Sequence, residues 1–301
     1  MAFKHVVATL MLVMAPWLAH ARTVAGVADI QGEKPRYLQQ VSMDFDNAAA
    51  VQQALFVPAL DDGFIPQGLA QRKGAFYVSG YVQARDGQRP ECRIYRLLKD
   101  KPRERILLPL PASCNHAGGL AMTDGGVLLI SDNIRLFTLL VSDGGKPLKR
   151  AAREIRLQAP LKGTFVSYHR GMVYLGSYMK DLDVTRVHVF PQSVLSKAEI
   201  SVKDAVDSFD APHKSQGAYF DDSDYAWTTS QAKGFNYLNK FNMKTRKTEQ
   251  RYRLVRGMQG IVKDADGSLW VVSEAGALKY RDWSQRFPAI FRLDVKRLQA
   301  E

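Results

Sequence analysis

The stretch from Cys114 to Asn133, CNHAGGLAMTDGGVLLISDN, carries the residue types of this chain best suited to acid–base chemistry. A histidine beside an aspartate can act as a general base, and His116 and Asp132 stand near the two ends of the stretch. We expect Asp132 to be the partner of His116, because one short segment carries both. His116 is therefore the candidate catalytic base if the protein is a hydrolase.

Familiar catalytic and phosphate-binding motifs do not accompany this histidine. The sequence has no Gly-x-Ser-x-Gly elbow, which gives a hydrolase triad little support. Its glycine pairs, at 118–119 and 125–126, do not make the Gly-x-Gly-x-x-Gly pattern of a phosphate-binding loop. The second pair follows Asp124 and is typical of a hairpin turn.

The N-terminus has the layout of a secretory signal peptide over residues 1–21. A short basic start, an apolar run over residues 6–18 and the small-x-small sequence Ala19-His20-Ala21 predict cleavage before Arg22. An uncleaved anchor is the alternative. No later apolar stretch approaches membrane length, so we expect the mature chain to have no transmembrane segment and to be secreted or periplasmic.

The two cysteines, Cys92 and Cys114, are expected to form a disulfide in that oxidising environment. Two thiols alone cannot complete a tetrahedral zinc site, and no spaced pair of histidines stands nearby. The alternative is a pair of buried, unbonded thiols.

A repeated pattern organises the rest of the chain. Each copy has a small-residue start, an apolar strand, a polar or glycine turn, and a second strand that closes on a serine. The copies are PQGLAQRKGAFYVSGY, HAGGLAMTDGGVLLISDN, GTFVSYHRGMVYLGSY, SQGAYFDDSDYAWTTSQ and MQGIVKDADGSLWVVSEAG. The closing serines are Ser79, Ser131, Ser177, Ser230 and Ser273.

A third strand follows every copy. A fourth follows the first four copies, and EISVKDAV from Glu199 is the fourth strand expected for the third copy.

Four antiparallel strands in each repeat of about 50 residues are typical of a β-propeller. The sequence predicts five blades, with the last blade completed by an N-terminal strand in VQQALFVPA, residues 51–59. Such closure leaves no open sheet edge in the ring. We expect residues 22–50 to be an N-terminal extension and residues 51–301 to be one propeller domain. The alternatives are a sixth blade built from residues 22–50, with PRYLQQVSMDF as a strand, and a β-sandwich.

Propeller geometry brings the start of each first strand and the end of each second strand to one end of the central channel. The polar residues at these positions are the predicted ligand-binding set Gln67, His116, Asp132, Gln216, Gln259 and Glu274. Such a ring suits a polar ligand or an ion. The alternative is that these side chains satisfy strand ends around a water-filled channel. Cys92 and Cys114 fall on the same face, so their disulfide would tie blade one to blade two.

Basic residues dominate the composition, with 42 Lys and Arg against 30 Asp and Glu and a net charge of +12. Many of them fall in the turns between expected third and fourth strands, which lie on the face opposite His116. In one interpretation, these basic residues protect the outer strands from pairing with the strands of other molecules. In the other interpretation, they bind an anionic surface of the cell envelope. The sequence has no motif for sequence-specific nucleic-acid binding.

The repeats, best seen in MQGIVKDADGSLWVVSEAG, resemble the superfamily of SMP-30/gluconolactonase-like, strictosidine-synthase-like, paraoxonase-like and NHL-type propellers. The resemblance spans roughly residues 60–300. It implies a divalent cation, Ca²⁺, in the channel, for which Asp132, Asn133 and Glu274 are the possible oxygen ligands. Gln67 stands where such enzymes have an acid. His116 in HAGGL resembles the channel histidine of paraoxonase-like proteins.

Two functions follow from these residues. The first is an exported propeller that binds a polar small molecule, an ion or an envelope protein at the channel without catalysis. The second is a cation-assisted lactonase- or esterase-like hydrolase in which His116 is the base. The low number of acids near the channel favours the binding protein.

Overall fold

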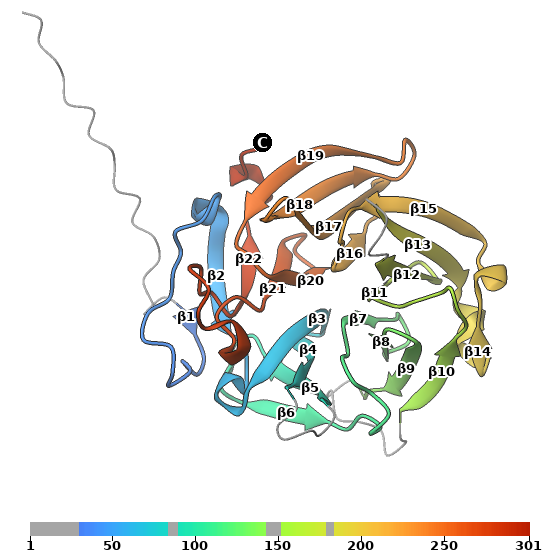
Figure 1. The fold of residues 1–301 in the computed structure, drawn as a ribbon, viewed down its shortest axis with the longest axis horizontal. Coiled ribbons are helices and arrows are strands. Elements are labelled where there is room, and N and C mark those ends of the chain that lie inside the picture. The colour runs from blue at the N-terminus through green and yellow to red at the C-terminus, as the bar shows by residue number, and fades with distance from the viewer. Residues whose placement is uncertain (1–29, 84–89, 143–151, 179–183) are drawn as a thin grey trace, which may run out of the picture.

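Five mostly antiparallel sheets surround a central axis, and Figure 1 looks along that axis. The structure is a computed structural model that describes residues 30–83, 90–142, 152–178 and 184–301. Each sheet is one blade, so the predicted all-β, five-bladed propeller is confirmed. The predicted signal peptide lies outside the described residues. No helix in the described part of the chain is long and apolar enough to cross a membrane.

In blades one to four, the strands follow the chain from the channel outward. Blade one contains β3 (Phe64–Arg72), β4 (Ala75–Val82), β5 (Glu91–Leu98) and β6 (Arg105–Leu108). Blade two contains β7 (Gly119–Met122), β8 (Val127–Asp132), β9 (Arg135–Leu140) and β10 (Arg153–Leu157). Blade three contains β11 (Phe165–His169), β12 (Met172–Tyr178), β13 (Val184–Pro191) and β15 (Asp207–Pro212). Blade four contains β16 (Gly217–Phe220), β17 (Tyr225–Ala232), β18 (Phe235–Asn242) and β19 (Lys247–Leu254).

Blade five joins the two ends of the chain. It contains β20 (Met258–Lys263), β21 (Leu269–Ser273) and β22 (Ala289–Leu293), and its fourth strand is the N-terminal β2 (Val51–Phe56). β2 pairs antiparallel with β22, and Figure 1 shows the blue and red strands side by side. Closure by an N-terminal strand is therefore confirmed. The short 3-10 helices are η2 (Ala48–Ala50), η3 (Leu60–Asp62), η4 (Gln192–Ser196), η5 (Val202–Asp204), η6 (Leu278–Tyr280) and η7 (Val295–Arg297).

The segment before β2 does not form a sixth blade, so that alternative is wrong. From residue 30 on, where the structure describes it, this segment contributes one strand, β1 (Ile30–Gln31), which pairs in parallel with β2 at the outer edge of blade five. PRYLQQVSMDF forms no strand. Its Leu38, Met43 and Phe45 instead pack into the cluster that contains Phe287, and the Phe45 and Phe287 ring centroids are 5.5 Å apart. The apolar residues of this segment serve to cover blade five.

The fourth strand of blade three also differs from the prediction. The expected segment EISVKDAV contributes β14 (Glu199–Ile200), which pairs in parallel with β10 of blade two. The chain then turns at η5, where Ser201 caps Lys203 N–H and the Asp204 carboxylate accepts from Ser201 N–H. β15 takes the outer place beside β13. Its sequence DSFDAP buries only Phe209 and Ala211, a weak hydrophobic signal for a strand.

The apolar runs of the second strands reflect burial on both faces of a blade. In β4, Phe76 and Val78 pack against blade five, where Phe76 meets Trp270 at 4.7 Å between ring centroids. The intervening Tyr77 packs toward blade two with Leu128. A strand buried on both faces has little polar alternation, which explains the continuous AFYV sequence.

The glycine in each Gln-Gly or Gly-Gly start lets neighbouring inner strands approach one another. A Cβ atom at Gly68 would lie 2.5 Å from the backbone nitrogen of Leu120, and one at Gly260 would lie 2.3 Å from that of Leu69. Both separations are far below van der Waals contact, so the repeated glycine is a packing requirement of the ring. The motif therefore reports architecture rather than catalysis.

Candidate functional site

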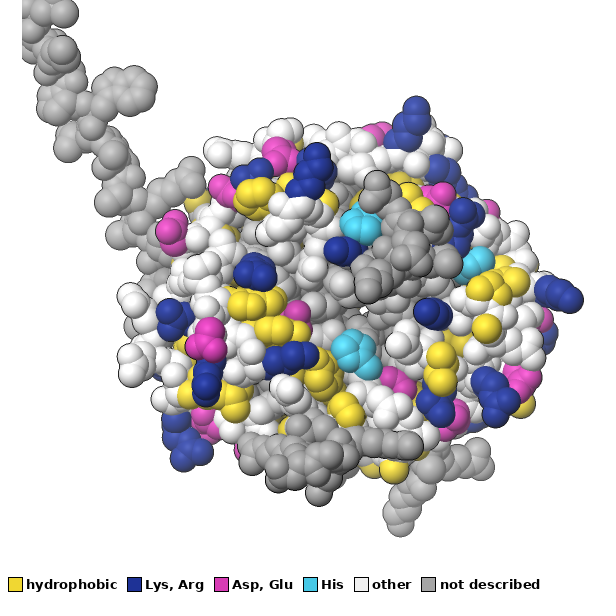
Figure 2. All heavy atoms as spheres, in the orientation of Figure 1, with side chains coloured by type: hydrophobic (Ala, Val, Ile, Leu, Met, Phe, Trp, Pro, Cys, Tyr) yellow, Lys and Arg dark blue, Asp and Glu magenta, His cyan; other side chains and the backbone are white. Residues whose placement is uncertain are grey.

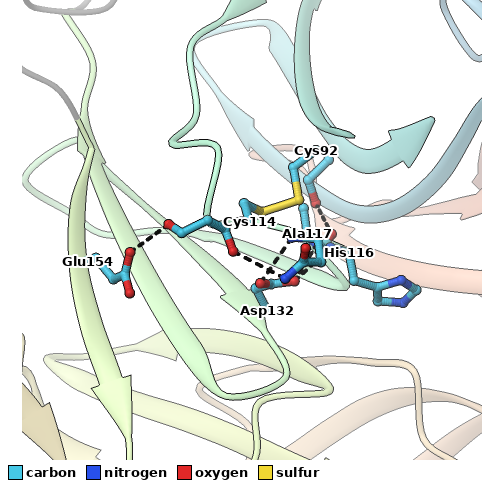
Figure 3. The surroundings of a disulfide bond; sticks show 9 residues. Cys92, Cys114, His116, Ala117, Asp132 and Glu154 are labelled. Atoms are coloured by element: carbon cyan, nitrogen blue, oxygen red, sulfur yellow. Dashed lines mark hydrogen bonds between the residues drawn. A yellow bond between two sulfur atoms is a disulfide. The ribbon is translucent and has the colours of Figure 1, made fainter. Parts of the chain in front are cut away.

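The disulfide between Cys92 and Cys114 is confirmed, with the two Cα atoms 5.7 Å apart. It joins β5 of blade one to the connection that leads into β7 of blade two, as Figure 3 shows. Among the described residues, these two sulfurs and a carboxylate oxygen of Asp132 lie within 4.8 Å of one another. The disulfide occupies both sulfurs, so this group is not a thiolate metal site.

Asp132 binds the backbone beside His116 rather than its imidazole. Its carboxylate accepts hydrogen bonds from the N–H groups of Asn115 at 3.2 Å, His116 at 2.7 Å and Ala117 at 3.3 Å. Figure 3 shows the His116 ring pointing away from this carboxylate. The expected base–carboxylate pair is therefore not assembled, because the carboxylate is used to fold the connection between blades one and two.

Replacing Asp132 with asparagine tests this structural role. The amide has one acceptor oxygen and no charge, so we expect Asp132→Asn to lower the free energy of unfolding by about 1–2 kcal/mol. Urea denaturation measures the change. The control, Asp282→Asn, alters an aspartate whose side chain is 92% exposed and should shift stability by less than about 0.5 kcal/mol. Equal effects of the two substitutions would contradict the role given to Asp132.

His116 lies at the end of the channel where the inner strands begin, which we call the channel mouth. Its ring packs on Tyr81, with 4.8 Å between ring centroids, and the residue is exposed to solvent. Partial burial lowers the pKa of His116, nearby Asp132 opposes this shift, and the positive charge of Lys279 adds to it. The imidazole is therefore mainly neutral at pH 7.

Three of the predicted ligand residues form one buried hydrogen-bonded cluster at the channel mouth. The Glu274 carboxylate accepts from Gln67 Nε2 at 2.7 Å and from Gln259 Nε2 at 2.9 Å. Burial raises the pKa of Glu274 to about 7, although the two amides and the charges of Lys279 and Arg256 oppose the shift. The Oε1 atom of Gln259 is buried and accepts no hydrogen bond from the described residues.

The remaining predicted residues do not join this cluster. Gln216 is half-buried at the start of blade four, and its backbone N–H pairs with Thr229. Asn133 is exposed, and its backbone exchanges hydrogen bonds with Gly163.

Among the closing serines, the hydroxyls of Ser79, Ser177 and Ser273 donate to backbone carbonyls of blade connections, those of Ala117, Lys162 and Arg256. These three serines thus help to fix the connections between blades, whereas Ser230 accepts from Asn239 Nδ2 and the buried Ser131 hydroxyl has no partner among the described residues.

The donor arrangement does not fit the Ca²⁺ site that the family resemblance implies. Calcium needs six to eight oxygen ligands, and the carboxylates of Asp132 and Glu274 are each surrounded by N–H donors. N–H dipoles that point at a carboxylate favour an anion and would repel a cation placed there. Calcium binding stays a prediction, and titration is its test.

A row of aromatic and basic side chains crosses the channel mouth above this cluster and was not identified from the sequence. Arg256 lies 3.9 Å from the ring centroid of Trp283, which packs at 4.3 Å on Tyr280. Lys279 lies over the rings of Tyr280 and Tyr81, at 5.2 and 5.4 Å, and donates to the Tyr81 hydroxyl at 2.9 Å. Lys279, Tyr280 and Trp283 of this row belong to the long segment between β21 and β22, ALKYRDWSQRFP, which is the sequence signal for it.

Several basic residues of the outer turns, by contrast, have carboxylate partners. Lys101 pairs with Glu104, Arg105 with Glu33, Lys244 with Asp224, and Arg246 with Asp207. Arg251 and Arg253 both pair with Glu301. These contacts favour the interpretation in which outer charges protect strand edges. Docking of these turns on an anionic envelope surface remains a prediction.

The opposite end of the channel opens into a funnel of about 690 Å³. It is lined by ends of the inner strands of all five blades and by the turns that follow them, including those at His169, Asp221 and Lys263. Acids and bases pair with each other there: Asp222 contacts His169 at 3.1 Å and Arg170 at 2.8 Å.

Comparisons with known proteins concern the fold alone. No protein-family model matches the chain, and no curated protein matches its sequence. The PQQ-bound form of aldose sugar dehydrogenase from Streptomyces coelicolor is similar at 13% identity and a TM-score of 0.48, over 76% of this chain and 93% of that one. A glucose dehydrogenase-type oxidoreductase from Thermus thermophilus is similar at 13% identity and a TM-score of 0.44, over 75% and 82%. The Dos1 propeller is similar at 10% identity and a TM-score of 0.39, over 77% and 72%.

Proposed function

We propose that this protein is a binding propeller that holds a polar ligand at the channel mouth and works in the periplasm or outside the cell. The observation that carries the proposal is the buried Gln67–Glu274–Gln259 cluster beneath the row from Arg256 to Tyr81. A few convergent polar groups among aromatic rings are typical of ligand sites. The disulfide supports an oxidising compartment.

Two features of the cluster support a ligand rather than a purely structural role. The buried Gln259 Oε1 atom lacks a donor among the described residues, and such an atom costs free energy unless something satisfies it. In addition, a carboxyl with a pKa of about 7 changes charge near neutral pH, and strongly shifted groups concentrate at functional sites.

The hydrolase alternative has less support from the geometry. His116 would need a partner to orient its ring, and the carboxylate expected to do so binds the backbone. A cation would have to displace the N–H donors around Glu274. We therefore propose binding without catalysis, with His116 as part of the wall of the site.

Thermal unfolding with a small panel of compounds tests the proposal. The panel contains citrate, pyrophosphate, glucose, arginine and Ca²⁺. A compound at about ten times its Kd stabilises the folded state by about 1.4 kcal/mol, which raises the Tm of a domain of this size by about 3–6 °C. We expect at least one member to do so.

Two tryptophan substitutions locate the site. His116→Trp fills the channel mouth and should abolish the shift, whereas Arg170→Trp, at an exposed residue of the opposite funnel, should preserve it. Loss of the shift only in Arg170→Trp would place binding in the funnel and refute the proposal. Absence of any shift across the panel would also count against it.

A further inference from the structure

Four basic residues of the channel mouth form no ion pair with a carboxylate in the described part of the chain. Lys162, Lys214 and Arg256 lie in the connections that lead into the inner strands β11, β16 and β20, and Lys279 lies between β21 and β22. Lys162, Arg256 and Lys279 are exposed, and Lys214 is half-buried. These connections meet at the end of the channel that carries Gln67, Gln259 and Glu274.

The basic residues of the channel mouth differ in their ion pairing from those of the outer turns. On the outer turns, basic side chains such as Lys101, Arg105 and Arg246 are paired with acids. At the mouth, these four side chains form no ion pair in the described part of the chain, although Arg256 and Lys279 interact electrostatically with the buried Glu274 carboxyl. Figure 2 shows this face, with Lys, Arg and His side chains around its central hollow. Several like charges around one opening focus the electrostatic potential and attract anions.

Two of the four cations are already held in place by aromatic rings. Arg256 lies over Trp283, and its backbone N–H donates to Gln285 at 2.7 Å. Lys279 lies over Tyr81 and Tyr280. A cation–π contact orients a cation without neutralising it. Since these side chains are ordered before binding, an anion that contacts them loses less affinity to the ordering of side chains.

The buried carboxyl beneath the row does not oppose an anion as a fixed charge would. Glu274 is enclosed by the amides of Gln67 and Gln259, and its raised pKa leaves it partly protonated near neutral pH. An approaching anion would favour the protonated form, because like charges disfavour each other.

We infer that the ligand of the channel mouth is a small organic anion with two or more carboxylate or phosphate groups. Arg256 and Lys279 hold one of its charged groups, and Lys162 and Lys214 attract another from the connections of blades three and four. This inference rests on the proposed function and names its ligand class.

Isothermal titration calorimetry at low ionic strength tests the inference with citrate and pyrophosphate as probes and glucose as the neutral comparison. We expect at least one anion to bind, and the two probes distinguish carboxylate from phosphate recognition. Arg256→Met with Lys279→Met should weaken binding roughly tenfold or more, as expected for the loss of charged hydrogen bonds. The charge-matched control, Lys101→Met with Arg297→Met, removes two ion-paired residues and should change the Kd by less than about twofold.

A second double variant serves as a fallback, and each outcome bears on the inference in a different way. If the Arg256 and Lys279 double variant fails to fold, Lys162→Met with Lys214→Met serves in its place, with the same expectation. Equal binding by mouth and control variants would overturn the inference, as would binding of glucose with neither anion bound. The glucose result would leave the proposed function standing, whereas no binding by any compound of the panel would refute both.

Discussion

Replacing both cysteines with alanine, Cys92→Ala with Cys114→Ala, is expected to lower the free energy of unfolding by about 3 kcal/mol. The bond links residues separated by 22 positions, and a cross-link of that span restricts the unfolded chain. Both side chains also lie in the buried cluster with Tyr77 and Ile94, so their truncation leaves space that adds to the loss. Urea denaturation of the two proteins measures the difference.

Reduction of the native protein provides the matched comparison, since it breaks the bond without changing side-chain volume. A phosphine reductant should bring the wild type close to the stability of the double variant and leave the variant unchanged. If the fully reduced wild type, with both thiols titrated, kept its original stability, the structural role of the bond would be refuted. Reduction should also weaken ligand binding, because the bond fixes the connection that carries His116.

Replacing Glu274 with glutamine should remove a stability loss that the wild type shows between pH 5 and pH 8. The pKa of this carboxyl is raised from 4.5 to about 7 in the folded protein, so the folded state binds a proton that the unfolded state releases. The resulting stabilisation is complete below about pH 4.5 and disappears as the pH rises through about 7. The variant side chain is neutral throughout. We therefore expect the stability of Glu274→Gln relative to wild type to rise by about 2–3 kcal/mol from pH 5 to pH 8.

Urea denaturation at both pH values gives this difference directly. Glu104→Gln is the control, because the Glu104 side chain is 68% exposed and pairs with Lys101, three residues before it. Its stability relative to wild type should change little over the same range. If the curves of Glu274→Gln and wild type run parallel from pH 5 to pH 8, the pKa of the Glu274 carboxyl is not raised and the role given to its burial is refuted.

The fold could be predicted from the sequence where the pattern repeats. The glycine starts recur because neighbouring inner strands approach each other closely, as at Gly68 and Gly260. Three of the five closing serines, Ser79, Ser177 and Ser273, bind the connections between blades. The fourth strand of blade three was misplaced because outer strands bury few residues. DSFDAP has only Phe209 and Ala211 to mark it, whereas the more apolar EISV segment was diverted to blade two.

The candidate site was predicted in part. Gln67, Gln259 and Glu274 were placed together from their positions in the repeat, and the structure joins them by hydrogen bonds. The partnership of His116 and Asp132 was wrong, because sequence proximity does not reveal that a carboxylate is used by backbone N–H groups. The aromatic and basic row was missed because Lys279, Tyr280 and Trp283 belong to one blade's insertion, and no spacing in the sequence links them to Tyr81 and Arg256.

The sequence by itself determined the ring of five blades, its closure by an N-terminal strand and the disulfide, since each depends on local pattern or on residues that repeat at a regular spacing. Only the tertiary structure decided which charges are compensated. Arg246 and Arg256 look alike in sequence, yet one meets Asp207 and the other meets the face of Trp283. Partners of that kind come from other parts of the chain, and packing of the blades alone brings them within reach.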